Sequence, residues 1–317
     1  MKTAIVLGAT GGTGQVIISE LLTRGINVIA FGRSESKLKE LMKKNNFNQQ
    51  LSFKLGDIFD YKTIVEAAKD AEVIFQCANV QYQEMASRLL LLGENVMKAA
   101  NILQKKIVIV DGIYVYGHQV GNGDENHPKQ PHTKKGKLRV AFENLIFSRK
   151  WENAKPLIVR LPDYYGPTSQ NSYLQPTLEG MAAHKIPIFI GNLKTPREYV
   201  YLPDAAKMIV NIAETEDAYR ENWNIPGAGL ISGKEIIKIA REITGNRRVV
   251  IPLNKTAIRF IGMFDPFMRE VVEIMYLTKE GFVLSGEKYE KRIGSIPATP
   301  FAKGLEETLR FLIRDKQ

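Results

Sequence analysis

The chain has 317 residues, of which 44% are hydrophobic and 25% charged, so a large folded core is expected. No run of about 18 uncharged apolar residues is present, which excludes a membrane span, and a single cysteine excludes an internal disulfide and suits the cytoplasm. The four histidines lack metal-ligand spacing, so no metal site is expected. The net charge is +10, but the basic residues are not interleaved with aromatic residues as on a surface that binds nucleic acid. The charge therefore favours an anionic small-molecule ligand over nucleic acid.

Strand and helix patterns alternate through the first half of the chain. Strands are predicted near residues 2–7, 26–31, 51–55, 72–76, 106–110 and 156–160, and helices near 13–24, 34–45, 60–69, 84–103 and 135–149. Short apolar runs separated by helices indicate parallel strands buried on both faces. Right-handed crossovers would wind these elements into a doubly wound α/β sheet.

The pattern loosens after residue 161. Helices are predicted near 174–184, 203–214, 233–244 and 255–280, with short strands near 187–190, 198–201 and 248–251. This mixture indicates a smaller lobe folded over the edge of the sheet. The segment 256–277 is unusually apolar; core packing is the simplest explanation, and a lid over a substrate cleft or a subunit contact are the alternatives.

A glycine-rich turn joins the first strand to the first helix. Glycines allow a tight turn and a close backbone approach, and a helix N-terminus attracts phosphate. The strand–turn–helix context therefore predicts a site for the pyrophosphate of a dinucleotide. The residues expected to hold it are Gly8, Thr10, Gly11, Gly12, Thr13 and Gly14.

The end of the second strand bears on the choice of cofactor. An NAD site places a carboxylate here for the ribose hydroxyls, but the chain reads Gly32-Arg33-Ser34. A cation suits a 2′-phosphate instead, so Arg33, supported by Ser34 or Lys37, favours NADP(H), with NAD(H) as the alternative.

The ends of the third and fourth strands supply further candidate cofactor contacts. Asp57 would accept a hydrogen bond from the adenine amino group, or else cap the next helix. The other residues expected beside the cofactor are Ile58, Cys77, Ala78 and Asn79. Cys77 follows an apolar strand, and burial disfavours a reactive thiolate there.

Further landmarks appear in order along the chain. They are Gly56-Asp57, Val115-Tyr116-Gly117, Arg160-x-x-Asp163-x-Tyr165-Gly166-Pro167, Arg197-Glu198-Tyr199 and Asn224-Ile225-Pro226. Together with the glycine turn they resemble the extended branch of the short-chain dehydrogenase/reductase superfamily over nearly the full length. The resemblance implies a Rossmann sheet of about seven parallel strands and a smaller C-terminal α/β substrate lobe. We therefore expect a dinucleotide-binding domain in residues 1–165, with return segments from roughly 195–226, and mainly a substrate lobe in 166–317.

The reactive residues of that superfamily are not preserved. It has Ser or Thr three residues before the valine of Val115-Tyr116-Gly117, where this chain has Gly112, and a Tyr-x-x-x-Lys pair on the next helix. Glu143 aligns Arg139 with the family lysine and Lys135 with the tyrosine; in the other register Lys137 and Thr133 take these places. Neither register supplies a tyrosine, so the chain resembles the atypical members.

Hydride transfer to a carbonyl requires a proton donor, which the family tyrosine provides. Lys135 is one candidate donor here, and Arg139 is a candidate anchor for ribose or phosphate. Tyrosines at strand ends are further candidates, with Tyr116 and Tyr165 ahead of Tyr114 and Tyr164. Arg197 matches the position at which sugar-nucleotide members of the superfamily hold a diphosphate, so the resemblance implies an anionic substrate.

Two functions fit these observations. The first is an NADP(H)-dependent oxidoreductase or epimerase-like enzyme for a small carbonyl or hydroxyl substrate, and the alternative is a non-catalytic nicotinamide-nucleotide sensor. A homodimer through helices 84–103 and 135–149 is also expected, because apolar residues recur there at helical spacing and could face either the sheet or a partner. These residues are Met85, Leu89, Leu92, Val96 and Ala100.

Overall fold

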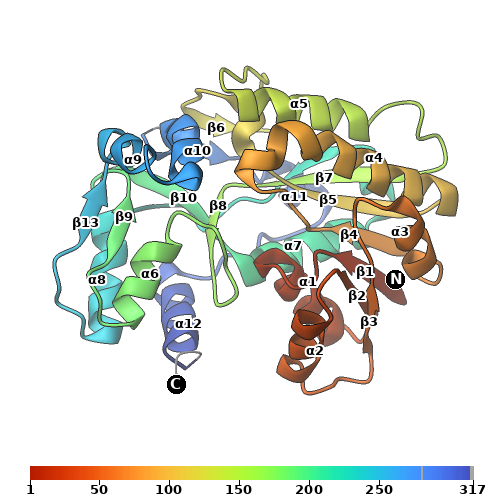
Figure 1. The fold of residues 1–317 in the computed structure, drawn as a ribbon, viewed down its shortest axis with the longest axis horizontal. Helices are drawn as coiled ribbons and strands as arrows, with labels where there is room; N and C mark the ends of the chain where they lie inside the picture. The colour runs from red at the N-terminus through yellow and green to blue at the C-terminus, as the bar shows by residue number, and fades with distance from the viewer. Residues whose placement is uncertain (280, 315–317) are drawn as a thin grey trace.

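A parallel seven-stranded sheet forms the centre of the molecule (Figure 1). The computed structural model describes residues 1–279 and 281–314. The strand order is β3-β2-β1-β4-β5-β7-β11, and every neighbouring pair is parallel. The strands are β1 (Thr3–Leu7), β2 (Asn27–Gly32), β3 (Leu51–Leu55), β4 (Val73–Gln76), β5 (Lys106–Gly112), β7 (Lys155–Leu161) and β11 (Asn222–Asn224). The predicted doubly wound Rossmann sheet is confirmed.

Helices cover both faces of this sheet, as Figure 1 shows. One layer contains α1 (Gly12–Thr23), α2 (Glu35–Lys44) and α7 (Leu202–Glu214), and the other α3 (Tyr61–Ala68), α4 (Met85–Leu103) and α5 (Lys134–Ile146). Successive side chains of β1 alternate between the layers, with Val6 in the first core and Ile5 in the second. The five apolar residues of α4 expected at helical spacing are all buried in the second core, so they serve the sheet.

The C-terminal lobe is built on smaller sheets. Its strands are β8 (Asp163–Tyr165), β10 (Pro196–Tyr201) and β12 (Leu230–Ser232) in one sheet, β9 (Ile188–Ile190) with β13 (Ile251–Leu253), and β14 (Phe282–Leu284) with β6 (Gly121–Gly123). Its helices are α6 (Gln175–Ala182), α8 (Gly233–Thr244), α9 (Lys255–Ile261), α10 (Pro266–Ile274), α11 (Glu287–Arg292) and α12 (Phe301–Arg314). Helices α6, α8 and α12 enclose a third core. Short 3₁₀ segments are η1 (Tyr82–Glu84), η2 (Ile113–Tyr116), η3 (Glu216–Ala218) and η4 (Met275–Thr278).

The single helix predicted over 255–280 is instead α9, α10 and η4. Pro266 lacks a backbone donor and begins a new helix rather than continuing the old one. Gly262 lies where the two helices approach closely, since a Cβ there would be 2.9 Å from the Arg269 backbone. The chain therefore folds back into a hairpin of two helices. No helix among the described residues has the length and apolar character needed to cross a membrane.

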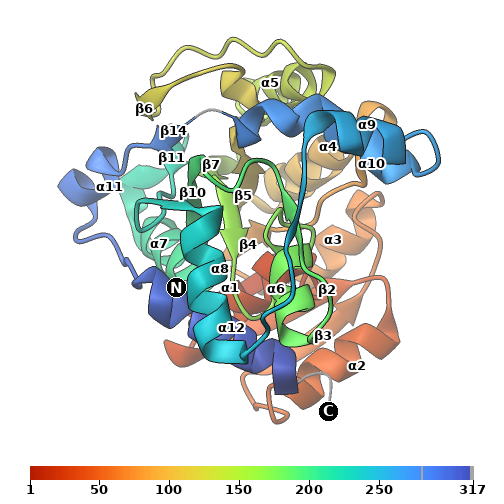
Figure 2. The same ribbon diagram turned by 90° about the vertical axis from the view of Figure 1, so that its left-hand side faces the viewer.

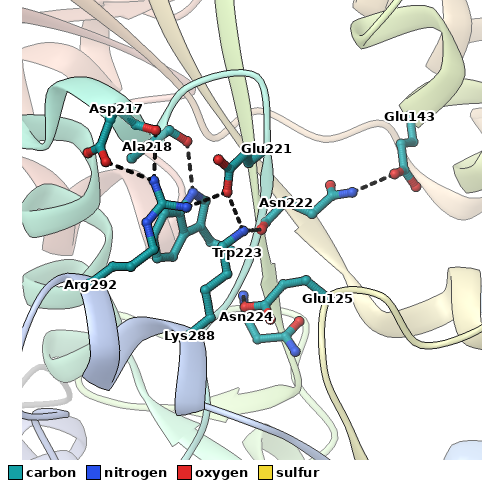
Figure 3. A network of polar contacts seen from close by, with 10 residues as sticks. All are labelled: Glu125, Glu143, Asp217, Ala218, Glu221, Asn222, Trp223, Asn224, Lys288 and Arg292. Carbon is teal, nitrogen blue, oxygen red and sulfur yellow. Dashed lines mark hydrogen bonds and ion pairs between the residues drawn. The ribbon is translucent and has the colours of Figure 1, made fainter.

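The last strand of the central sheet is held by a polar network that Figure 3 shows. The buried Trp223 ring lies against two cations of the C-terminal lobe, Lys288 at 4.3 Å and Arg292 at 4.8 Å from its centroid. The Asn222 amide donates to Glu143 on α5 at 2.6 Å. These contacts fix β11 and α11 to the edge of the sheet, so a segment distant in sequence completes the nucleotide fold.

Candidate functional site

A cavity of about 790 Å³ lies at the carboxyl ends of the parallel strands and extends into the C-terminal lobe. Ten of the residues predicted to contact the cofactor line it: Gly8, Thr10, Gly11, Gly12, Thr13, Arg33, Ile58, Cys77, Ala78 and Asn79. Gly14 and Asp57 were predicted alongside them but are not lining residues. These ten residues alone come from segments up to about seventy residues apart in sequence, which the cavity brings together.

The glycine turn has the backbone geometry that a phosphate site needs. Gly8 has φ +78°, and a Cβ there would be 2.5 Å from the Ala78 nitrogen, while a Cβ on Gly14 would be 2.4 Å from the Gly8 oxygen. Gly11 is the N-cap of α1 and has no side-chain cap, and no acidic residue lies in the first turn. The N-terminus of α1 is therefore available to an anion, so this turn fits a dinucleotide pyrophosphate.

Gly12 has a second reason to be glycine. The Thr168 hydroxyl donates to its carbonyl at 3.0 Å, and a Cβ on Gly12 would be 2.4 Å from the Thr168 oxygen. The loop after β8 thus packs directly on the start of α1. A side chain at this position would displace that loop whether or not a ligand is bound.

Arg33 lies at the end of β2 and lines the cavity with an exposed side chain. It forms no ion pair with any residue that the structure describes. The neighbouring Ser34 has a structural role, because its hydroxyl caps α2 by accepting a hydrogen bond from the Lys37 amide. Arg33 is therefore a cation at the end of β2 that has no ion-pair partner among the described residues.

The two acidic residues after β3 have separate structural roles. Asp57 accepts from the Phe59 amide at 3.0 Å and holds the turn that brings Ile58 to the cavity. Asp60 caps α3 by accepting from the Lys62 amide. On the next strand, burial raises the pKa of the Cys77 thiol, so it stays protonated at neutral pH.

The structure decides between the two registers of α5. Lys135 and Arg139 are both buried on the inner side of the helix, whereas Lys137 is exposed. Thr133 is the N-cap of α5 and accepts from the Gly136 amide at 3.0 Å. Arg139 therefore stands at the family lysine position and Lys135 at the tyrosine position.

Arg139 lines the cavity and is held by two side chains. Its guanidinium pairs with Asp111 at 2.8 Å and donates to Asn79 at 2.9 Å. Asp111 is itself buried at the end of β5, immediately before Gly112. This arrangement fixes the guanidinium of Arg139 at the edge of the cavity, beside the ends of β4 and β5.

Lys135 is engaged away from the cavity. Its ammonium pairs with Glu270 and, at 2.7 Å, with Glu273, both on α10, and its side chain is 3% exposed. Glu273 also accepts from the Lys135 amide at 3.0 Å. Lys135 is not among the residues that line the cavity, and its ion pairs fasten α10 to the start of α5.

The two tyrosines ranked first as displaced donors also lie outside the cavity. Tyr116 is buried with its ring 5.2 Å from that of Phe282, and Tyr165 packs against Tyr201 and Gly304 in the third core. Strand ends alone do not tell which way a side chain turns, and these two tyrosines turn into apolar cores.

A different pair of tyrosines reaches the cavity. Tyr114 and Tyr82 both line it, and their hydroxyl oxygens are 2.8 Å apart. Burial raises the pKa of Tyr114 well above its usual value, while the charge of Arg139 acts in the opposite direction. Sequence reasoning missed Tyr82, since it lies in a 3₁₀ turn before α4 and belongs to no motif.

The far end of the cavity lies in the C-terminal lobe and contains Arg197, which is buried and donates to the Ile190 carbonyl at 3.1 Å. Two carboxyl groups line the same end. Burial raises the pKa of Asp163 to about 6, with Arg197 opposing the rise, and raises the pKa of Glu198 to about 7. This end therefore combines one fixed cation with two acids that titrate near neutral pH.

The strand order, the glycine turn and a cavity at the strand ends define a Rossmann protein that binds a nicotinamide dinucleotide. The model of the NAD dependent epimerase/dehydratase family matches residues 4–226, and the chain belongs to this family. It is thus an NAD(P)-dependent, epimerase/dehydratase-like enzyme of the extended short-chain dehydrogenase/reductase type.

Individual relatives are distant. A UDP-glucose 4-epimerase from Rickettsia bellii is 24% identical over 277 residues, covering 82% of this chain and 74% of the relative. A sterol-4-alpha-carboxylate 3-dehydrogenase from Dictyostelium discoideum is 24% identical over 183 residues, covering 52% and 54%. The structure of UDP-glucuronic acid 4-epimerase from Bacillus cereus with NAD has a TM-score of 0.81 at 18% identity, covering 100% of both chains. These similarities establish the fold.

Proposed function

We propose that this chain is a cytoplasmic, NADP(H)-dependent oxidoreductase or epimerase-like enzyme for a small anionic carbonyl or hydroxyl compound. The observation that carries the proposal is the single cavity that joins the glycine turn and Arg33 to Arg139 and then to Arg197. The cations suit, in that order, a 2′-phosphate, a ribose and an anionic substrate group. A bound nicotinamide would supply or accept the hydride.

The preference for NADP(H) rests on Arg33. Its guanidinium has no ion-pair partner among the described residues, and it lines the cavity beside the end of β2. A guanidinium can form charge-assisted hydrogen bonds to two oxygens of a phosphate. A ribose with free hydroxyls offers no charge to pair with it.

The proposed proton donor is Tyr114, with Tyr82 as its hydrogen-bonded partner. A tyrosine hydroxyl is protonated at neutral pH, so Tyr114 can donate to a developing alkoxide. Burial raises its pKa and weakens it as an acid, while the charge of Arg139 lowers the pKa and so assists donation.

A second candidate is the sensor without chemistry. It is favoured by Gly112, which offers no hydroxyl at the family Ser/Thr position, and by Lys135, whose charge is compensated by two carboxylates. In this role the cavity would bind the nucleotide and the protein would signal through a partner.

The deciding experiment follows NADPH oxidation against a panel of small carbonyl compounds with anionic groups. Tyr114→Phe is expected to lower turnover by ~10²–10⁴-fold, because a general acid is lost. Tyr116→Phe is the matched control, since this tyrosine is buried outside the cavity. Full turnover by Tyr114→Phe would reject the donor assignment, and tight NADPH binding with no turnover on any substrate would favour the sensor.

A further inference from the structure

The hairpin formed by α9 and α10 has a buried inner face. Ile258, Val271 and Met275 form a small core, against which Tyr82 and Tyr173 pack from the side of the cavity. Tyr82 and Tyr173 also line the cavity, so the hairpin lies over its substrate end. Core packing therefore explains the apolar residues on the inner face of the hairpin, but not those on its outer face.

The turn of the hairpin exposes three large apolar side chains. Phe260, Met263 and Phe264, here called the tip, are 65%, 57% and 80% exposed. The rings of Phe260 and Phe264 lie edge to face with centroids 6.2 Å apart. Figure 2 shows the turn between α9 and α10 projecting outward from the lobe. A single exposed apolar residue is ordinary, but three within five positions on a projecting turn indicate a contact surface.

The charge that the hairpin offers to solvent is mainly positive. Lys255, Arg259 and Arg269 are exposed, and none forms an ion pair with a residue that the structure describes. The acids of α10, Glu270 and Glu273, are instead turned inward to Lys135. Arg269 donates to the Gly262 carbonyl at 3.1 Å, which compensates no charge. Cations without ion-pair partners next to exposed aromatic residues are typical of segments that lie at the surface of an anionic membrane.

A second copy of the chain fits this surface poorly. In a two-fold symmetric contact the same patch meets itself, so these cations would face each other. Asp265, the acid nearest the tip, accepts from the Met268 amide and so contributes to the start of α10.

We propose that the α9–α10 hairpin binds peripherally to an anionic lipid bilayer. The tip would enter the boundary between headgroups and acyl chains, and Lys255, Arg259 and Arg269 would lie among the lipid phosphates. This mode needs no spanning helix, so it agrees with the absence of one among the described residues. The inference does not depend on the proposed enzymatic function.

The test is co-sedimentation of the full chain with lipid vesicles at low ionic strength. Vesicles of phosphatidylcholine and phosphatidylglycerol in equal parts are expected to retain the protein, and phosphatidylcholine vesicles are not. Phe260→Ser with Phe264→Ser is expected to weaken binding to the anionic vesicles about tenfold or more. Phe47→Ser is the matched control, because Phe47 is 67% exposed on a distant loop.

Two charge-reversal variants test the electrostatic contribution to vesicle binding. Arg259→Glu should reduce vesicle binding, whereas Lys43→Glu on α2 should leave it unchanged, and thermal unfolding should show that all variants fold. The proposal is overturned if anionic vesicles do not retain the wild type, or if the double Phe variant binds as well as the wild type. It is also overturned if light scattering shows a wild-type dimer that the double variant dissociates, which would make the tip a subunit contact.

Discussion

The glycine turn and the β5–α5 region lie at the same edge of one sheet but differ in what they would present to a ligand. The turn offers backbone: the uncapped start of α1 and glycines whose Cβ atoms would collide with main chain. The β5–α5 region offers side chains, and here every family position has changed, with Gly112, Lys135 and Arg139 in place of the reactive residues.

A site made of backbone tolerates sequence divergence better than a site made of side chains does. A phosphate turn needs only small residues and a helix start, whereas proton transfer needs one particular group within hydrogen-bond reach. The substituted cations are not left unpaired. Arg139 has Asp111, and Lys135 has Glu270 and Glu273, so the former reactive positions now join elements together.

The largest expected effect is on NADPH binding, from a substitution in the glycine turn. Gly11→Val should weaken NADPH binding about a hundredfold or more, because a branched side chain would occupy the space for the pyrophosphate. Gly11 has φ −78° and its Cβ would meet only the Gly8 oxygen at 3.3 Å, so the fold should persist. Gly12→Val, which must displace Thr168, should lower the unfolding temperature as well. Calorimetry and thermal unfolding check both, and undiminished affinity in Gly11→Val would show that the pyrophosphate lies elsewhere.

The next largest effect concerns the preference of the cofactor site for NADPH over NADH. The wild type should bind NADPH more tightly than NADH by roughly ten- to a hundredfold, the equivalent of about 1.5–3 kcal/mol for a charged hydrogen bond. Arg33→Ala should remove most of this preference and leave NADH affinity nearly unchanged. Lys43→Ala serves as the control, because Lys43 is an exposed cation near the far end of α2. Equal affinities of the wild type for the two nucleotides would refute the assignment.

The smallest effect concerns the substrate end. Asp163 has a pKa raised to about 6, so its carboxylate is charged above that pH and neutral below it. Asp163→Asn should strengthen binding of UDP-glucose, used as a diphosphate probe, about fivefold at pH 8, roughly 1 kcal/mol of removed repulsion. The advantage should vanish near pH 5, where the wild-type carboxyl is protonated. If the difference in UDP-glucose affinity between Asp163→Asn and the wild type does not depend on pH, Asp163 does not face the ligand.

The cofactor end was more predictable from sequence than the catalytic end. Glycines and strand–helix alternation are local signals, and ten predicted contacts line one cavity. The donor was harder to predict, because Tyr114 and Tyr116 are two residues apart and only one turns inward. The placement of Tyr82 depended on a 3₁₀ turn that no periodicity marks.

The sequence by itself determined the sheet, the phosphate turn and the family, because apolar periodicity and glycine spacing are set along the chain. It also determined that the Ser and Tyr positions had changed. The tertiary structure decided which register of α5 faces inward, where Lys135 finds its carboxylates, and that α9 and α10 form a hairpin. The first two outcomes depend on the direction of a side chain or on partners more than a hundred residues away, and a local pattern contains neither. The hairpin depends on the close approach of Gly262 to Arg269, which the apolar pattern does not reveal.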